Sequence, residues 1–221
     1  QAGTLNCNRH GDRSDGRVMS HLHEPGPRLR SVEQAAERAT LGPNEVRVWY
    51  APLDWPDVDI RPLESSLSLD ERRRAERFRF DRDRNWFVAR TAVLRAILGE
   101  CLGVPARSIV FIFGAHGKPE LSPACNPHRL CFNVSHSHGL GVIALAVDRA
   151  VGVDVEWVKP LVDYEAIARQ HFSQAENIAL SQVTPADRLQ AFFNCWTRKE
   201  AFVKARGEGL SLPLDSFEVS L

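Results

Sequence analysis

The sequence predicts a globular protein that combines amphipathic helices with short β-strands. Apolar residues recur at helical spacing between about 82 and 102, and runs of β-branched and aromatic residues occur at 46–50 and 130–147. At 151–157 apolar and polar residues alternate, which is the pattern of a strand with one buried face. A chain of 221 residues is long enough to bury the core of one large domain or two small ones.

Composition and cysteine usage argue against several classes of protein. The chain has 28 basic and 28 acidic residues, so no overall field attracts an anionic partner, and we expect neither nucleic acid nor membrane as a partner. The five cysteines show no zinc-site spacing, and no apolar run has the ~18 residues of a membrane span. Without a signal-peptide core, these features predict a reduced, cytoplasmic protein.

The first part of the chain is expected to contain two helices and four strands. Residues 1–44 are mostly polar and lack periodicity, which predicts a flexible extension. Ser68 and Glu71 have capping-box spacing at the start of one helix, and Gly103 and Pro105 stop the next. We expect strands at 46–50, 108–113, 130–136 and 140–147 (the last buried on both faces), helices at 70–80 and 82–102, and a loop at 114–123.

After the alternating segment, the chain is mainly helical. Ser173 and Glu176 again have capping-box spacing, and Gly207 and Gly209 end the longest helix. We expect helices at 162–171, 174–182 and 185–206, and a final strand at 215–221.

Two carboxylates on the alternating segment indicate a site for a hard metal ion. Asp154 and Glu156 are two residues apart on the predicted strand, so both side chains lie on the same side. Two like charges this close are costly unless a cation lies between them or one of them is protonated. A solvated strand face has the same pattern, so this segment alone leaves both interpretations open.

A third carboxylate is available on the last long helix. Glu200 and Lys204 are four residues apart and therefore lie on one helical face, a spacing that also suits an ordinary surface ion pair. His136 and Lys118 likewise fit an ordinary turn and an exposed loop. A group of arginines fits a solvated helix face equally well: Arg72, Arg73, Arg74 and Arg77.

Taken jointly, these residues predict phosphoryl or pyrophosphate chemistry. Three carboxylates without zinc ligands favour Mg²⁺, which commonly shares a substrate phosphate. Arginine, lysine and histidine side chains elsewhere supply counter-charges for a polyphosphate. The sequence contains no P-loop, dinucleotide-binding glycine pattern or set of kinase motifs.

Four short stretches connect the chain to a known family. They are Gly-Lys-Pro at 117–119, Phe-Asn-Val-Ser-His-Ser at 132–137, Gly-Val-Asp-Val-Glu at 152–156 and Trp-Thr-Arg-Lys-Glu-Ala-Phe-Val-Lys at 196–204. With these motifs, and with the stretch that follows at 209–217, the chain resembles the Sfp-type 4′-phosphopantetheinyl transferases over about 46–221. Each motif is weak alone, but their order and spacing together are specific.

The resemblance implies an α+β fold of two halves related by a pseudo-twofold axis, each a small antiparallel sheet packed with helices. The halves would be residues 45–149 and 150–221, with coenzyme A and Mg²⁺ in the cleft between them. Members of the family move the 4′-phosphopantetheine arm of coenzyme A onto a serine of an apo acyl or peptidyl carrier protein and release adenosine 3′,5′-bisphosphate. The two-halves design also implies a monomer.

The resemblance further assigns roles to single residues. Asp154, Glu156 and Glu200 would hold Mg²⁺, and Glu200 would also take the proton of the carrier serine. Lys204 would stabilise the transition state at the attacked phosphate. The coenzyme A site would consist of Arg74, Arg90, Lys118, Pro119, Asn133, Ser135 and His136, together with Asp154 and Lys204.

The chain departs from the family at both ends. Family members usually continue with further strand beyond the position of Leu221, so we expect the second sheet to be incomplete, and residues 1–44 have no counterpart. Two other functions stay open: a coenzyme A or carrier-protein binding module without catalysis, and a metal-dependent phosphohydrolase.

Overall fold

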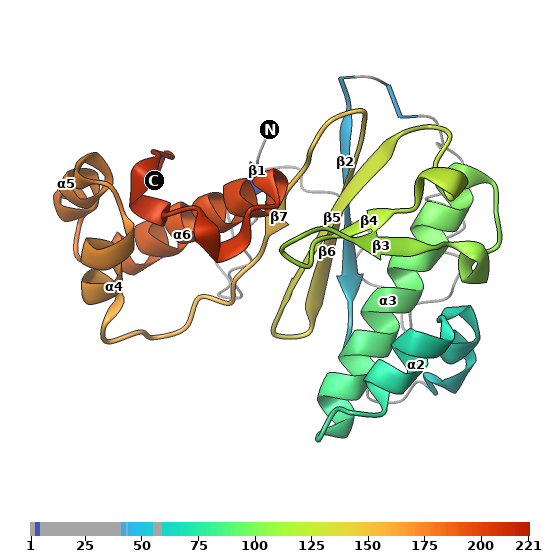
Figure 1. The fold of residues 1–221 in the computed structure, drawn as a ribbon. Helices are drawn as coiled ribbons and strands as arrows, with labels where there is room; N and C mark the ends of the chain where they lie inside the picture. The colour runs from blue at the N-terminus through green and yellow to red at the C-terminus, as the bar shows by residue number, and fades with distance from the viewer. Residues whose placement is uncertain (1–2, 5–40, 43, 55–58) are drawn as a thin grey trace, which may run out of the picture.

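The structure of the protein is a computed structural model, and its chain forms two lobes joined by an extended segment (Figure 1). One lobe is built around an antiparallel sheet, and the other consists of helices. The predicted α+β class is therefore confirmed. The residues that the structure describes are 3–4, 41–42, 44–54 and 59–221.

The first lobe contains a three-stranded antiparallel sheet with strand order β2–β6–β5. The central strand β6 is buried on both faces, as predicted: Ile143 and Leu145 belong to one core cluster, and Val142 and Ala144 belong to another. The strands are β2 (Val46–Pro52), β5 (Leu130–Ser137) and β6 (Leu140–Val147).

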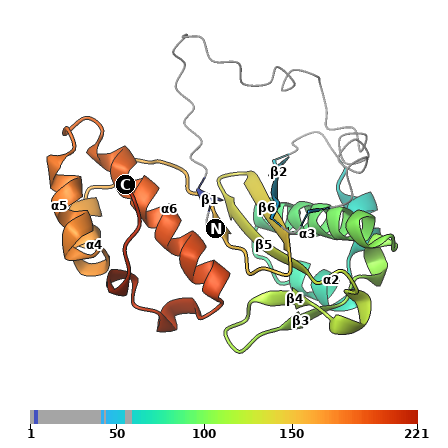
Figure 2. The ribbon, with the colours of Figure 1, turned by 90° about the horizontal axis from the view of Figure 1, so that it is seen from above.

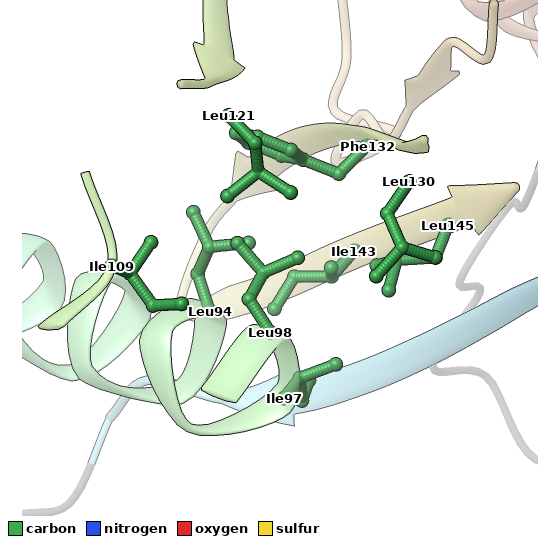
Figure 3. Packing of buried hydrophobic residues seen from close by; sticks show 9 residues of the cluster. All are labelled: Leu94, Ile97, Leu98, Ile109, Leu121, Leu130, Phe132, Ile143 and Leu145. Carbon is green, nitrogen blue, oxygen red and sulfur yellow. The ribbon is translucent and has the colours of Figure 1, made fainter. Parts of the chain in front are cut away.

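Helix α3 (Asp81–Leu102) covers one face of this sheet, as Figure 2 shows from above. Its Leu94 and Leu98 pack with Ile143 and Leu145 of β6 in the largest apolar cluster of the lobe (Figure 3). These leucines lie on the stripe predicted from helical spacing, so the sequence correctly identified the buried side of the helix.

Helix α2 (Leu69–Ala75) is fixed against α3 by an ion pair whose arginine is buried and whose glutamate is partly buried. The predicted capping box is present, because Ser68 Oγ accepts from Glu71 N and the Glu71 carboxylate accepts from Ser68 N. The same carboxylate accepts a hydrogen bond of 2.7 Å from Nε of Arg95, which is 2% exposed. Since breaking this pair leaves the buried arginine with an uncompensated charge, this contact holds α2, and with it Arg74, in place.

A short hairpin occupies the region between α3 and β5. Strand β3 (Phe111–Phe113) is shorter than the strand expected at 108–113, because a 3₁₀ turn precedes it. Strand β4 (Pro119–Leu121) pairs with β3, so the prediction of an unbroken loop at 114–123 was wrong. The 3₁₀ helices are Arg61–Ser66, Ala106–Ser108, Pro123–Cys125, Gly209–Ser211 and Leu214–Ser216.

The second lobe consists of three helices at nearly the predicted positions. Phe192 and Phe193 of the longest helix pack with Phe172 in its core. The capping box at Ser173 and Glu176 is confirmed. None of the described helices is long and apolar enough to cross a membrane. The helices are α4 (Tyr164–His171), α5 (Gln174–Gln182) and α6 (Arg188–Arg206).

The strand expected at 215–221 is not present. Instead, side chains of α5 and α6 bind the backbone of this segment: Lys199 Nζ donates to the carbonyl oxygen of Phe217, and Glu176 accepts from Val219 N, both at 2.7 Å. Lys199 and Glu176 also form a buried pair of 2.7 Å with each other. Because helix side chains satisfy these backbone groups, the described part of the second lobe lacks the antiparallel sheet expected for that half.

The segment 151–157 runs between the lobes, on the sheet face opposite α3. Its valines belong to the same cluster as the alternate residues of β6. Only β7 (Val153–Asp154) is a strand, and it pairs in parallel with β1 (Gly3–Thr4), so the predicted strand was too long. Apart from these two residues and a few just before β2, the extension predicted at 1–44 lies outside the described residues.

Gly152 allows helix α6 to approach this joining segment closely. A Cβ atom at this position would lie 1.9 Å from the carbonyl oxygen of Ala201 and 2.5 Å from the nitrogen of Ala205, both backbone atoms of α6. A side chain cannot be accommodated unless the helix moves. The glycine thus sets the distance between α6 and Asp154.

We predict that Gly152→Ala destabilises the protein, because α6 would have to shift away from the joining segment. Overpacking costs about 1–3 kcal/mol or more, and each kcal/mol lowers Tm by roughly 2–4 °C in a chain of this size. Thermal unfolding measures the effect. Gly114→Ala is the matched control, because its Cβ would come no closer than 3.8 Å to the nearest atoms. Equal Tm values for Gly152→Ala and wild type would contradict the packing.

Candidate active site

Polar side chains of β5 hold the joining segment against the sheet. Three of them, spaced two residues apart and therefore on one face of the strand, accept hydrogen bonds from every second backbone N–H of the segment. We call this set the polar ladder, and it explains why the segment is extended without being a regular strand throughout. Its pairs are Asn133 with Val153 at 2.9 Å, Ser135 with Val155 at 3.4 Å and Ser137 with Trp157 at 3.0 Å.

Asp154 is the buried acidic centre of the site, with 3% of its surface exposed. Its Oδ1 atom accepts from Ser135 Oγ at 2.8 Å and from Lys204 Nζ at 2.5 Å. Lys204 Nζ also donates to Ser135 Oγ at 3.1 Å. The Oδ2 atom of Asp154 is buried and has no hydrogen-bond partner among the described residues. Because such an oxygen is costly to leave unpaired, it is a candidate ligand for a cation.

Glu156 and Glu200 interact electrostatically with this buried charge. Burial raises the pKa of both carboxyls above the ordinary value, and the negative charge of Asp154 raises both further. The two carboxylates of the joining segment and the one of α6 are therefore close enough to affect one another electrostatically, and their role as Mg²⁺ ligands stays a prediction. Within the described part of the chain, however, no three acidic, histidine or cysteine side chains form a ready metal cage.

A cluster of cationic side chains lies next to the polar ladder. Arg90 Nη1 donates to Nδ1 of His136 at 2.8 Å, and the guanidinium groups of Arg90 and Arg74 lie 5.6 and 5.3 Å from the ring centre of Phe87. Partial desolvation and the positive charges of Arg90 and Lys204 lower the pKa of His136 to about 4. The imidazole is therefore neutral at physiological pH. Positive charges gathered this closely favour an anionic ligand.

Arg74 extends the cationic cluster to the surface of α2. A hollow of about 620 Å³ lies on this side of the helix, and Arg74 belongs both to its lining and to the pair of arginines on Phe87. The residues lining the hollow are Asp70, Arg73, Arg74, Arg77 and Phe78.

Lys118 connects the hairpin of the first lobe to α6. Its Nζ donates to the carbonyl oxygens of Ala205 at 3.0 Å and Val151 at 3.4 Å. Ala205 lies in the last turn of α6, where free carbonyl groups favour a cation. Burial lowers the pKa of the lysine. Pro119 follows as the first residue of β4, and the contact of both residues with coenzyme A stays a prediction.

Comparison with known proteins now places the chain in a family. The family model described as the 4′-phosphopantetheinyl transferase superfamily matches residues 150–221, and that of the N-terminal part of 4′-phosphopantetheinyl transferases matches residues 57–148. The chain is 37% identical over 182 residues to the 4′-phosphopantetheinyl transferase HetI of Nostoc sp., a match that covers 82% of this chain and 76% of the relative. The chain belongs to the 4′-phosphopantetheinyl transferase superfamily.

Two further relatives support this assignment. This chain is 39% identical over 174 residues to the 4′-phosphopantetheinyl transferase psf-1 of Bacillus pumilus, a match that covers 77% of this chain and 71% of the relative. It is 32% identical over 157 residues to the 4′-phosphopantetheinyl transferase Sfp of Bacillus subtilis, with 71% and 67% covered. The resemblance inferred from the four motifs is confirmed.

Sequence reasoning missed one residue of the transferase site and one buried residue that anchors the second lobe. Ser137 was not among the predicted site residues, although its alternation with Asn133 and Ser135 in an otherwise apolar strand was a usable signal. Lys199, which is fully buried beside Glu200, carried no signal, because its partners lie far away in the sequence.

We predict that Glu200→Gln stabilises the metal-free transferase increasingly as pH rises. The folded state raises the pKa of Glu200, so its favourable contribution is complete below the unfolded value near 4.5 and is lost as pH rises through the folded value. Glutamine stays neutral throughout. The measurement is the difference in Tm between variant and wild type, with a chelator present, from pH 4.5 upward. The titration of His136 affects both proteins equally and therefore cancels in this difference. A difference that does not grow with pH would refute the raised pKa of Glu200.

Proposed function

We propose that this transferase moves the 4′-phosphopantetheine arm of coenzyme A onto a serine hydroxyl of an apo acyl or peptidyl carrier protein. The observation that carries the proposal is the contact of Lys204 with Asp154 and Ser135, one strand residue away from the His136–Arg90 pair. Acidic and cationic groups thus meet at the junction of the lobes, as binding a metal-bridged diphosphate requires. The names of the relatives support the reaction type.

The cationic cluster provides the phosphate-binding part of the site. Arg74 and Arg90 would bind phosphate oxygens of coenzyme A through their guanidinium N–H groups. With Nδ1 of His136 as the acceptor from Arg90, Nε2 would carry the proton and donate to a phosphate. Lys118 would add a charge from the hairpin. Pro119, Asn133, Ser135 and Lys204 complete the proposed contacts.

The acidic residues fit a Mg²⁺ ion. Asp154 offers a buried oxygen without a partner, and Glu156 and Glu200 have raised pKa values that a divalent cation would relieve. Carboxylate oxygens are the ligands that Mg²⁺ prefers, and one or two protein carboxylates suffice where it also binds substrate phosphates. Bound there, Mg²⁺ would neutralise charge on the leaving phosphate and orient the diphosphate.

Glu200 and Lys204 would carry out the group transfer. Glu200 takes the proton from the carrier serine as the general base. The serine oxygen then bonds to the phosphorus of the phosphopantetheine group, and the bond from that phosphorus to the bridging oxygen breaks. Adenosine 3′,5′-bisphosphate leaves with the bonding electron pair. Lys204 stabilises the charge that develops on the attacked phosphate.

We also propose that the enzyme is a cytoplasmic monomer. The catalytic groups all come from the two lobes of one chain, so no second subunit is needed to complete the site. The described cysteines support a reducing compartment, because they are free thiols: Cys101, Cys125, Cys131 and Cys195.

The reaction can be tested directly with a panel of apo carriers of the acyl, peptidyl and aryl types. We predict that incubation with coenzyme A and Mg²⁺ adds the mass of the phosphopantetheine arm to at least one carrier, and that a chelator stops the addition. Mass spectrometry of the carrier is the measurement. Unmodified carriers throughout would contradict the proposal, and phosphate release from coenzyme A without a carrier would favour a phosphohydrolase.

We predict that Asp154→Asn lowers kcat/KM for transfer by about 10²–10³, the range seen when one electrostatic group of a catalytic site is removed. The amide keeps the shape of the side chain but removes the buried charge. Asp148→Asn is the control, because Asp148 is an exposed turn residue paired with Arg129. Initial rates and Tm are measured for both. Wild-type turnover in Asp154→Asn would refute the proposed metal site.

A further inference from the structure

Each serine of the polar ladder contacts two consecutive residues of the joining segment. Ser135 Oγ accepts from the N–H 20 positions further on and donates to the carboxylate of Asp154, 19 positions further on. Ser137 Oγ repeats this geometry: it accepts from Trp157 N at 3.0 Å and donates to Glu156 Oε2 at 3.4 Å. A hydroxyl has one donor and two acceptor sites, so both contacts can exist at once.

The turn that follows Ser137 provides a second contact with this part of the joining segment. The ring of His138 stacks on that of Trp157, with centroids 4.4 Å apart and planes 21° apart. His138 and Gly139 both have positive φ angles, 47° and 77°, which define the tight turn between β5 and β6. The residue after Glu156 is therefore fixed twice, through its backbone N–H and through its ring.

Glu156 depends on this anchoring more than Asp154 does. Asp154 is almost completely buried and has Ser135 and Lys204 as partners. Glu156 is only partly buried and has one more rotatable bond, and Ser137 is the hydroxyl that the structure places on its carboxylate. A flexible ligand must lose conformational freedom when it binds a metal, which lowers affinity.

We propose that Ser137 is a positioning residue that holds the Glu156 carboxylate in place for Mg²⁺. The inference rests on the metal site of the proposed function. Ser137 itself touches neither metal nor substrate in this assignment: it acts through Glu156, by fixing the backbone beside it and by directing one carboxylate oxygen. Ser135 and Ser137 then serve the two carboxylates of the joining segment in the same way.

The test is calorimetric titration of the full chain with Mg²⁺ alone, for wild type, Ser137→Ala and Ser137→Thr. We predict that Ser137→Ala raises Kd for Mg²⁺ about tenfold, the lower end of the range for partners of metal ligands. Ser137→Thr keeps the hydroxyl and restores wild-type affinity. In transfer assays the KM for Mg²⁺ of Ser137→Ala rises more than kcat falls. Ser181→Ala, which removes an exposed helix hydroxyl, is the matched control.

The outcomes separate this inference from the proposed function. Wild type that does not bind Mg²⁺ overturns the metal site itself. Wild type that binds Mg²⁺ while Ser137→Ala binds it equally well overturns the role of Ser137 and leaves the metal site standing. An equal loss of Mg²⁺ affinity in Ser137→Ala and Ser137→Thr also overturns the role of Ser137, because packing rather than the hydroxyl would then determine the affinity. If Ser137→Ala does not fold, Ser137→Cys takes its place in the same comparison.

Discussion

The polar ladder between β5 and the joining segment is the interaction on which the site depends. The apolar contacts of its valines with β6 hold the segment on the sheet and already oppose a shift by one residue, because that shift would turn Asp154 and Glu156 to the buried side. Side-chain acceptors that match alternate N–H groups also oppose such a shift. Each bond contributes only about 0.5–1.5 kcal/mol, so the value of the ladder lies mainly in fixing the register.

The register in turn decides the electrostatics of the junction. The joining segment presents Asp154 to Lys204 of α6, while Gly152 allows α6 to come close enough for this contact. Carboxylates from the segment and α6 therefore gather around Lys204, while the arginines of α3 and α2 lie beside the neutral His136 of β5. Burial first, and then the neighbouring charges of this arrangement, raise the pKa values of the glutamates and lower the pKa of His136. A metal-bridged diphosphate would complement both sides.

Local patterns in the sequence predicted those features that depend on local interactions. Helical spacing identified the buried stripe of α3 and placed Glu200 and Lys204 on one face, and both capping boxes were correct. Alternation identified Asp154 and Glu156 but overestimated the strand, because a strand also needs a neighbouring backbone as partner. The strand prediction at 215–221 was wrong for a related reason. The backbone of this segment binds Lys199 and Glu176, which are far away in the sequence, and no local pattern reveals such partners. The bond of Lys118 to Ala205 was equally unpredictable.

Hydrogen exchange at the amides of Val153, Val155 and Trp157 tests most directly whether the polar ladder holds the joining segment in register on β5. If it does, these three amides exchange as slowly as the amides of the central strand β6, and Asn133→Ala accelerates exchange at Val153. Exchange of all three amides at the rate of an exposed loop in the wild-type protein would contradict the account.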